Sequence, residues 1–406
     1  MQNQQFTNPF KPGAGHMPPY LAGREKETKE FLQLLEQTTI LDNMVLTGLR
    51  GVGKTVLLDK FKPIAIGSKW LWVGTDLSES ASVTEETIAL RLLTDLSVVT
   101  SNITIRREEK AGLGFAAGQS FVDHKLNYNT LIEIFKTIPG LVSDKLKGVI
   151  EIVWKSLAPF QTRGIIFAYD EAQTMTDHAE KEQYPLSLLL DVFQSIQKKD
   201  IPFMLILTGL PTLFPKLVEA RTFSERMFRI VFLDKLNKEE SRDAIIKPID
   251  DAKCPIKFDK TSIELVIKES GGYPYFIQFI CREIYDVFLQ KVSDGKHPSV
   301  PIGEIIMKLD KDFFSGRWAK ATDRQRELLA VIASLSNCQE EFTVQEVVAE
   351  SKKHLSSPFS SSHANQMLAS LTNAGLVYKN RHGKYSFAVP LMDRFILRQN
   401  ISGFAK

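Results

Sequence analysis

Eight residues near the start of the chain have the types and spacing of a phosphate-binding loop: Gly48-Leu49-Arg50-Gly51-Val52-Gly53-Lys54-Thr55. An apolar run, 44–47, precedes them, and a helical pattern that starts at Val56 follows. Glycines let backbone N–H groups turn around phosphate oxygens, Lys54 brings positive charge to the outer phosphates, and the Thr55 hydroxyl can ligate Mg²⁺. The alternative, a glycine-rich turn with an incidental lysine, does not explain the flanking strand and helix. We therefore predict a nucleoside triphosphate site.

A second apolar strand, 164–169, ends in two carboxylates, Asp170 and Glu171. In nucleotide-binding α/β sheets the ligand lies beyond the carboxyl ends of the strands, where these side chains are expected. Asp170 would hold magnesium, and Glu171 would orient and deprotonate the attacking water. Many strands merely end in acidic loop residues, but the phosphate loop upstream favours the catalytic interpretation.

Length and composition indicate an ordinary globular protein of two or three domains, since the chain has 406 residues and a net charge of +3. This charge excludes a global polycation of the kind that coats nucleic acid. No apolar run approaches the roughly 20 residues that cross a bilayer, and the polar start is not a secretory signal, so we expect no membrane association and a cytoplasmic protein. The three cysteines lack the spacing of a metal site or a disulfide framework.

Strand patterns alternate with helical patterns as far as residue 235, which predicts an α/β fold with a mainly parallel sheet covered on both faces. The expected strands are 45–47, 70–73, 164–169, 203–208 and 229–232. Residues 98–127 interrupt this alternation as a hairpin, a partner-binding insertion or a mobile loop, and the pattern leaves the three open.

Four parts of the chain follow from the patterns. Residues 1–19 are expected to be a flexible arm, 20–235 the ATPase core, 236–316 a small helical domain, and 317–406 a winged helix of three helices and a hairpin. From Trp318 to Lys406 this part has eleven Lys and Arg against seven Asp and Glu. This excess favours an acidic partner there, although a solvated charged face would look the same.

The motifs in their order resemble an AAA+ ATPase of the replication-initiator-like clade, a branch close to the STAND signalling ATPases. The resemblance rests on residues 21–25 before the first helix, the phosphate loop, the strand ending at Asp170 and Glu171, the strand ending at 207–209, Arg226, and the turn at 271–274. It covers residues 20 to 290. The family is a P-loop NTPase fold with a parallel sheet core and a helical lid, often followed by a winged helix, and it implies ATP and Mg²⁺ as ligands.

The resemblance also implies roles for single residues. Leu21 and Gly23 would pack near the adenine, with Arg24 anchoring their loop, and Thr208 would contact the γ-phosphate or the attacking water. Arg226 would be an arginine finger that enters the site of a neighbouring subunit, which implies a homo-oligomer.

Arg226 has competitors for this role. Arg221 and Arg229 lie in the same stretch of sequence. A surface ion pair of Arg226 with Glu225 or Glu219 would also explain its presence.

One departure from the family concerns the lid. Many AAA+ proteins place an arginine after the lid glycine, whereas this chain has Gly272-Tyr273-Pro274. This turn resembles the STAND arrangement, in which the proline, here Pro274, packs against the nucleotide. Arg282 would replace the missing charge only if its helix faced inward. The departure favours a nucleotide-controlled switch over a fast motor.

The winged helix contains side chains that could bind double-stranded DNA. Its third helix would enter the major groove, and the hairpin would add positive charge. The candidate contacts are Ser361, His363, Asn365, Lys379, Arg381 and Lys384. Many winged helices contact only proteins, so this interpretation has an alternative.

Two functions are compatible with these residues. In the first, the chain is an ATPase in which Lys54, Thr208, Arg226 and Glu171 catalyse hydrolysis, and ATP occupancy controls assembly and a DNA-binding winged helix. In the second, it is a STAND-like switch with slow turnover whose winged helix and insertion bind a protein partner, for example in phage defence. Fold alone does not choose between them.

Overall fold

The computed structural model describes residues 7–13, 15–78, 80, 83–110, 120–254, 257–293, 300–381, 383–399 and 401. The chain forms two compact units, which we describe separately. The sheet unit comprises Glu25–Thr47 and Leu57–Phe232. The lid–wing unit comprises Met1–Arg24, Gly48–Val56 and Leu233–Lys406.

Five parallel strands form the centre of the sheet unit, in the order β2-β5-β6-β1-β7. They are β1 (Asn43–Thr47), β2 (Trp70–Val73), β5 (Gly164–Tyr169), β6 (Phe203–Gly209) and β7 (Phe228–Phe232). Every residue of β1, β5 and β6 is buried. Such strands are largely apolar because helices cover both faces of the sheet. The parallel sheet predicted from the sequence is confirmed.

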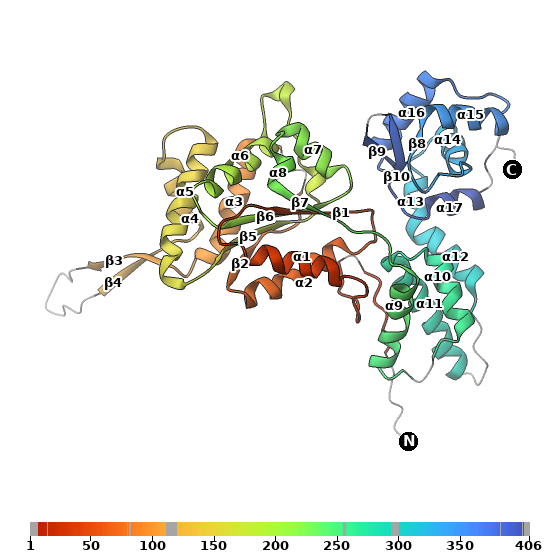
Figure 1. The fold of residues 1–406 in the computed structure, drawn as a ribbon, viewed down its shortest axis with the longest axis horizontal. Coiled ribbons are helices and arrows are strands. Elements are labelled where there is room, and N and C mark those ends of the chain that lie inside the picture. Colours follow the sequence, from red (N-terminus) through yellow and green to blue (C-terminus); the bar gives the residue numbers. More distant parts are fainter. Residues whose placement is uncertain are drawn as a thin grey trace. The chain divides into compact units, whose positions relative to one another are not determined.

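Helices lie on both faces of this sheet (Figure 1). On one face are α1 (Glu25–Leu35) and α2 (Lys54–Gly67), and on the other are α3 (Glu85–Thr100) and α6 (Pro185–Gln197). Two short helices, α7 (Leu213–Ala220) and α8 (Ser224–Met227), connect β6 to β7.

The buried amide of Asn43 joins four elements of the sheet unit. Its Oδ1 accepts a hydrogen bond from the Leu205 amide at 2.7 Å, and its Nδ2 donates to the Met227 carbonyl at 3.2 Å. The same amide pairs with the side chain of Gln197. Because buried polar groups need partners, these contacts fix β1 against β6, α8 and α6.

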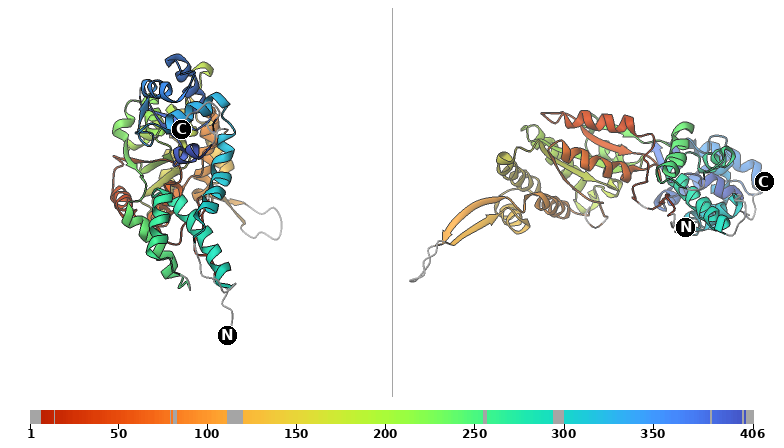
Figure 2. Two further views of the ribbon diagram at one scale, coloured as in Figure 1. Left: turned by 90° about the vertical axis from the view of Figure 1, so that its right-hand side faces the viewer. Right: turned by 90° about the horizontal axis from the view of Figure 1, so that it is seen from below.

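Residues 98–127 include a β-hairpin, one of the three interpretations that the sequence left open. Its strands are β3 (Thr104–Lys110) and β4 (Ser120–Lys125), which pair antiparallel and project from the sheet unit (Figure 2). Residues 111–119 and the side chains of 105–124 lie outside the described part of the chain. Two helices follow, α4 (Tyr128–Thr137) and α5 (Val142–Leu157).

The lid consists of helices, as predicted. They are α9 (Lys238–Asp251), α10 (Lys260–Ser270), α11 (Pro274–Ser293), α12 (Ile302–Leu309), a π-helical turn (Asp310–Phe314) and α13 (Ser315–Trp318). Asn237 caps α9 by accepting hydrogen bonds from the amides of Glu239 and Glu240.

Part of the N-terminal arm packs on the lid. Phe10 is 2% exposed, and its ring lies 6.3 Å from that of Phe258 and 6.4 Å from that of Tyr285. The Asn8 side chain donates to the Arg282 carbonyl at 2.9 Å. The residues before Asn8 that the sequence assigns to the arm, 1–6, lie outside the described residues.

A winged helix follows α13, as predicted. It contains α14 (Asp323–Ala333), β8 (Phe342–Thr343), α15 (Val344–His354), α16 (Ser361–Asn373), β9 (Val377–Arg381) and β10 (Lys384–Phe387). The three strands form an antiparallel sheet in the order β8-β10-β9. The sequence patterns missed the two-residue strand β8 and the final helix α17 (Met392–Arg398).

Helix α17 packs on the lid. Arg394 Nη1 donates to the Lys268 carbonyl at 2.7 Å, at the end of α10, and the rings of Phe395 and Phe314 stack 5.1 Å apart. Arg398 forms an ion pair with Asp310. Lid and winged helix therefore share one hydrophobic core.

No helix within the described ranges has the length and hydropathy that crossing a membrane requires.

Candidate nucleotide-binding site

The phosphate loop has the backbone geometry that its glycines predict. Gly51 and Gly53 have φ angles of 77° and 92°, in the left-handed region that favours glycine. A Cβ at Gly48 would lie 2.4 Å from the Leu233 carbonyl oxygen, so this position also excludes other residues. The ammonium of Lys54 donates to the carbonyls of Gly48 and Leu49, both at 3.0 Å, which keeps its charge within the loop. Thr55 and Val56 follow in the first turn of α2.

Arg24 anchors this loop from the segment before α1. It is 4% exposed, and its Nη2 donates to the carbonyls of Val52 at 2.9 Å and Asp234 at 2.8 Å. The neighbouring Gly23 has a φ of 61°, and a Cβ there would lie 2.5 Å from the carboxyl carbon of Glu240. Leu21 is half-buried in the same segment. The predicted adenine-side segment is thus tied to the phosphate loop and to the start of the lid.

The sheet unit brings three polar residues to one edge, at the carboxyl ends of neighbouring strands. Tyr169 of β5 pairs with Leu207 of β6, so Asp170 and Thr208 each lie one residue beyond this pair. Thr208 pairs in turn with the last but one residue of β1, and Thr47 follows it. Asp170, Thr208 and Thr47 are 4%, 0% and 3% exposed.

Two of these residues have hydroxyls that the fold does not satisfy. Oγ1 of Thr47 and Oγ1 of Thr208 are buried and have no hydrogen-bond partner among the described residues. Buried polar groups are nearly always paired, so an orphaned hydroxyl on Thr208, level with the buried carboxylate of Asp170, and a second one at the end of β1 fit a polar ligand or a hydrated cation. The donor set suits magnesium, which binds through one or two carboxylates or hydroxyls and the phosphates themselves. The sequence predicted Thr208 and Asp170 here but missed Thr47.

Glu171 has an unusual backbone and a held side chain. Its φ is 52°, a left-handed conformation that costs energy for a residue other than glycine and that often marks functional positions. Glu171 is exposed, and its backbone amide donates to the Asp170 carboxylate at 2.8 Å. The side-chain carboxylate of Glu171 accepts a hydrogen bond from Gln173 Nε2. Gln173 Oε1 in turn accepts from the Leu210 amide at 3.0 Å, after β6.

Gln173 is a positioning residue that the sequence analysis missed. Its carbonyl accepts from the ammonium of Lys216 at 2.8 Å, and burial lowers the pKa of Lys216. A Cβ at Gly209 would lie 2.6 Å from Gln173 Oε1, which explains the glycine that ends β6. The sequence signal that could have identified Gln173 was a side-chain amide two residues after Glu171.

The lid turn at 271–274 contacts the phosphate loop within the lid–wing unit. The Gly272 carbonyl accepts from the Leu236 amide at 2.8 Å, and Pro274 begins α11. The amide of Tyr275 donates to the Gly51 carbonyl at 3.1 Å. Proline at the first position of the helix fits because that N–H would have no helical partner.

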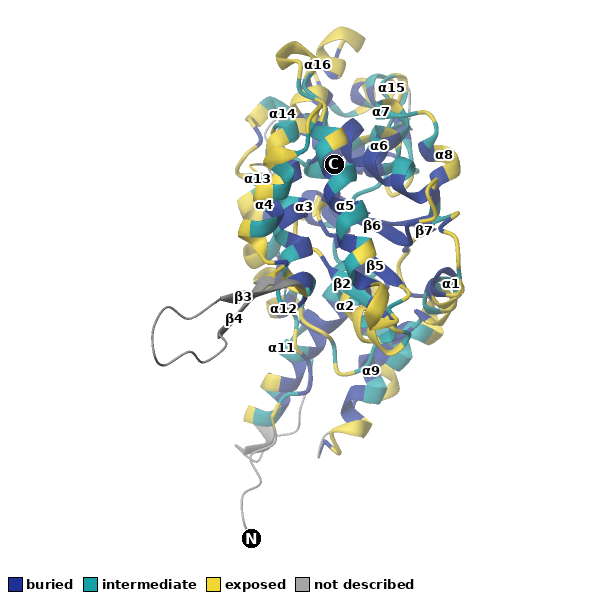
Figure 3. Cartoon of the chain, turned by 90° about the vertical axis from the view of Figure 1, so that its left-hand side faces the viewer, coloured by how far each residue is buried: buried dark blue, intermediate teal, exposed yellow. Residues whose placement is uncertain are grey.

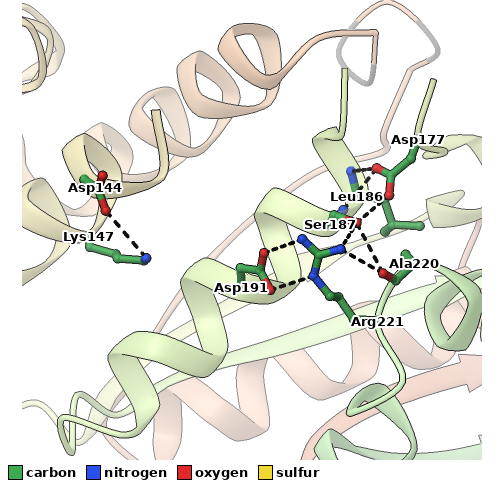
Figure 4. A network of polar contacts seen from close by, with 8 residues as sticks. All are labelled: Asp144, Lys147, Asp177, Leu186, Ser187, Asp191, Ala220 and Arg221. Atoms are coloured by element: carbon green, nitrogen blue, oxygen red, sulfur yellow. Dashed lines mark hydrogen bonds and ion pairs between the residues drawn. The ribbon is translucent and has the colours of Figure 1, made fainter. Parts of the chain in front are cut away.

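The three arginines considered for the finger differ in their surroundings. Arg221 forms two hydrogen bonds with Asp191, at 2.8 and 2.6 Å, and also binds Ser187, which Asp177 holds (Figure 4). Figure 4 also shows a separate ion pair on α5, between Lys147 and Asp144.

Arg229 pairs with Asp42 at 3.2 Å, whereas Arg226 on α8 is exposed. Within the described ranges Arg226 forms no ion pair, including the two with Glu225 and Glu219 that the sequence left open. Its selection over Arg221 and Arg229 remains a prediction.

The candidate DNA contacts lie on α16 and on the β-hairpin of the winged helix. Ser361, His363 and Asn365 are exposed, while their neighbours on the inner face of α16 are buried. Lys379 on β9 is exposed, and Lys384 on β10 is half-buried. The side chain of Arg381 lies outside the described residues. Figure 3 shows the exposed face of α16.

Comparisons with solved structures match this fold over nearly the whole chain. A Walker-type ATPase of Pyrococcus abyssi matches with a TM-score of 0.55 and 16% identity, over 93% of this chain and 96% of that one. The ORC2 protein of Aeropyrum pernix, in ADPNP–ADP complexes, matches with a TM-score of 0.53 and 14% identity, over 95% of each chain.

Sequence comparisons match less. A family model described as a domain of unknown function (DUF8462) matches residues 311–396, and no curated protein matches. The structural matches show the fold that the chain shares with these two proteins: a parallel-sheet α/β core, a helical lid and a C-terminal winged helix.

Replacing Arg24 with Met should loosen the phosphate loop, because the carbonyls of Val52 and Asp234 would lose hydrogen bonds to a charged donor, each worth about 1.5–3 kcal/mol. We expect hydrogen exchange of amides 48–56 to become about tenfold faster or more. Arg242→Met, which removes an arginine paired with Glu264 on the lid surface, is the control. Equal exchange in both variants would contradict this anchoring role.

Proposed function

We propose that the chain binds ATP with Mg²⁺, hydrolyses it as a homo-oligomer, and uses ATP occupancy to control a winged helix that binds double-stranded DNA. The observation that carries the proposal is the row of Asp170, Thr208 and Thr47 at the carboxyl ends of three strands, with two orphaned hydroxyls. Purely structural residues would not leave such groups without partners. Two of the solved structures similar to this chain are a Walker-type ATPase and a protein in ADPNP–ADP complexes.

Each residue has a proposed role. The loop amides and Lys54 bind the phosphates, Thr55 and Asp170 hold magnesium, and Thr208 orients the attacking water. Glu171 takes the proton of this water. Magnesium, when bound, neutralises charge on the phosphates.

Two substitutions test the ATP site directly. Lys54→Ala should reduce ATP binding about a hundredfold or more, because it removes the charge that binds the outer phosphates. Glu171→Gln keeps the shape but not the base, so ATP should bind normally while turnover falls about a hundredfold or more. Calorimetry and phosphate release measure the two effects, and Glu180→Gln, an exposed carboxylate in the same unit, is the control. Normal hydrolysis by Glu171→Gln would refute the catalytic assignment.

The homo-oligomer is proposed because Arg226 is exposed and uncommitted among the described residues, whereas Arg221 and Arg229 are paired. An arginine finger acts on the phosphate held by a neighbouring subunit, where it is worth about 10³-fold or more in rate.

Subunit mixing tests this role. Arg226→Ala and Glu171→Gln chains should each be inactive alone, but a mixture should regain part of the activity, because a Glu171→Gln subunit still donates Arg226 to its neighbour. Phosphate release measures recovery, and light scattering confirms assembly. Arg229→Ala, mixed with Glu171→Gln in the same way, should not show this complementation. If the mixture of Arg226→Ala and Glu171→Gln chains is no more active than either variant alone, a finger in trans is excluded.

DNA binding is proposed because α16 exposes Ser361, His363 and Asn365 beside a wing that carries Lys379, Arg381 and Lys384. Polar side chains at the start of a recognition helix and cations on a wing suit base edges and phosphates.

The triple variant Lys379→Ala, Arg381→Ala, Lys384→Ala should weaken binding to duplex DNA at all sequences. In a plot of log affinity against log salt concentration, the slope for this variant should be shallower by about one for each phosphate that it no longer neutralises. Fluorescence anisotropy over a salt series measures both effects. Removing Lys257 and Lys260, which lie near the start of α10, is the control for loss of positive charge elsewhere in the same unit. No DNA binding by the unchanged chain at low salt would leave the winged helix as a protein-binding module.

The switch with slow turnover has one observation in its favour. The winged helix and the lid line a pocket together with Leu49 of the phosphate loop, and its walls include Tyr273, Leu391 and Asp393. Burial and the charges of Asp234 and Asp393 raise the pKa of Tyr273 to about 12. A protein that keeps ADP through purification and turns over slowly would support this function, whereas rapid turnover without a partner would contradict it.

A further inference from the structure

Arg282, the arginine of α11 that the sequence offered as a lid cation, is paired within its own helix. Two nitrogens of Arg282 donate to Glu283, at 2.8 and 3.2 Å, and its guanidinium lies 5.6 Å from the centre of the Phe279 ring. This ion pair neutralises Arg282 within α11. A further cation from the same chain, beside Lys54, would help it to distinguish a triphosphate from a diphosphate.

Arg317, on the short helix between lid and winged helix, is held by an aromatic platform. Its Nη1 donates to the Phe313 carbonyl at 2.7 Å, and its guanidinium lies 4.5 Å from the centre of the Phe313 ring. The Phe313 ring lies 5.3 Å from that of Tyr275. A guanidinium stacked on an aromatic face is already ordered before it meets an anion.

The same platform contacts the phosphate loop. The Tyr275 amide donates to the Gly51 carbonyl at 3.1 Å, and a Cβ at Gly51 would lie 3.1 Å from the Tyr275 Cβ. Gly51 directly follows Arg50. The aromatic platform therefore brings Arg317, which is distant in sequence, to the loop that carries Arg50.

The positive charges of Arg50 and Arg317 are not balanced by a neighbouring carboxylate among the described residues. Burial, and then the positive charge of Arg50, lower the pKa of Arg317. Within the described ranges neither Arg50 nor Arg317 forms an ion pair with a carboxylate. Two half-buried guanidinium groups that repel each other without a counterion are stabilised by an anion that contacts both.

We propose that Arg50 and Arg317 together bind the terminal phosphate of a nucleoside triphosphate, with Arg317 supplied by the same chain. This inference rests on the proposed ATP function and deepens it. A diphosphate lacks the group that would satisfy both arginines, so the pair selects ATP over ADP. Helix α13 leads into the winged helix, and its Trp318 packs on Phe395 of α17, 5.8 Å between ring centres. Binding at Arg317 thus links the terminal phosphate to the attachment of the winged helix.

Nucleotide affinities measured by calorimetry test this pair. With Mg²⁺, Arg317→Gln should bind a non-hydrolysable ATP analogue about tenfold more weakly or worse, while its ADP affinity stays within about twofold. Arg50→Gln should reduce the ATP-to-ADP affinity ratio in the same direction, which tests the site from the loop side. Arg317→Lys keeps the charge but loses the planar fork, so it should recover part of the ratio.

Arg282→Gln is the matched control, because it also removes a half-exposed arginine stacked near a phenylalanine of the same unit. An unchanged ratio in Arg317→Gln, or an equal loss in Arg282→Gln, would overturn the inference while leaving ATP binding intact. Binding of neither nucleotide by the unchanged chain would overturn the proposed function as well. The two failures are therefore distinguishable.

Discussion

The lid–wing unit depends on the buried guanidinium of Arg24. A guanidinium removed from water must have its N–H groups satisfied, and here the carbonyls of Val52 and Asp234 accept from it. One side chain therefore fixes the segment before α1, the phosphate loop and the start of the lid. Because the loop amides must keep one orientation to bind phosphates, this internal anchor is a precondition of the proposed site.

A continuous packed path connects the loop to the winged helix inside this unit. The Tyr275 amide contacts Gly51, the rings of Tyr275 and Phe313 lie 5.3 Å apart, and Phe314 stacks on Phe395 of α17. Close-packed interiors move as units, so a change at the loop cannot stay local. The same shared core explains why lid and winged helix form one compact unit although the sequence divides them.

Features with local signals were predictable from the sequence, whereas contacts between distant segments were not. The phosphate loop, the five strands and the three helices of the winged helix each show a spacing or a period within a few residues. Strand β8 has only two residues, and the place of Thr47 one residue beyond the partner of Thr208 follows from the pairing of β1 with β6, which no local pattern encodes. Helix α17 was missed because a seven-residue helix gives barely two turns of periodicity. Helical spacing pointed to Arg282 as a lid cation, but Arg282 forms an ion pair with the neighbouring Glu283.

The terminal phosphate would then meet Arg50 and Arg317 of its own chain and Arg226 of a neighbouring subunit. Arg317 would come from the same chain and depend on how lid and winged helix pack, while Arg226 would come from a neighbour and depend on assembly. An anion between Arg50 and Arg317 relieves their repulsion before any neighbour arrives, since all of these groups belong to one chain. Binding of ATP would therefore order the winged-helix attachment first, and the finger in trans would act only on a subunit already in that state. Hydrolysis would remove the shared phosphate and restore the repulsion, which would couple turnover to release of the winged helix.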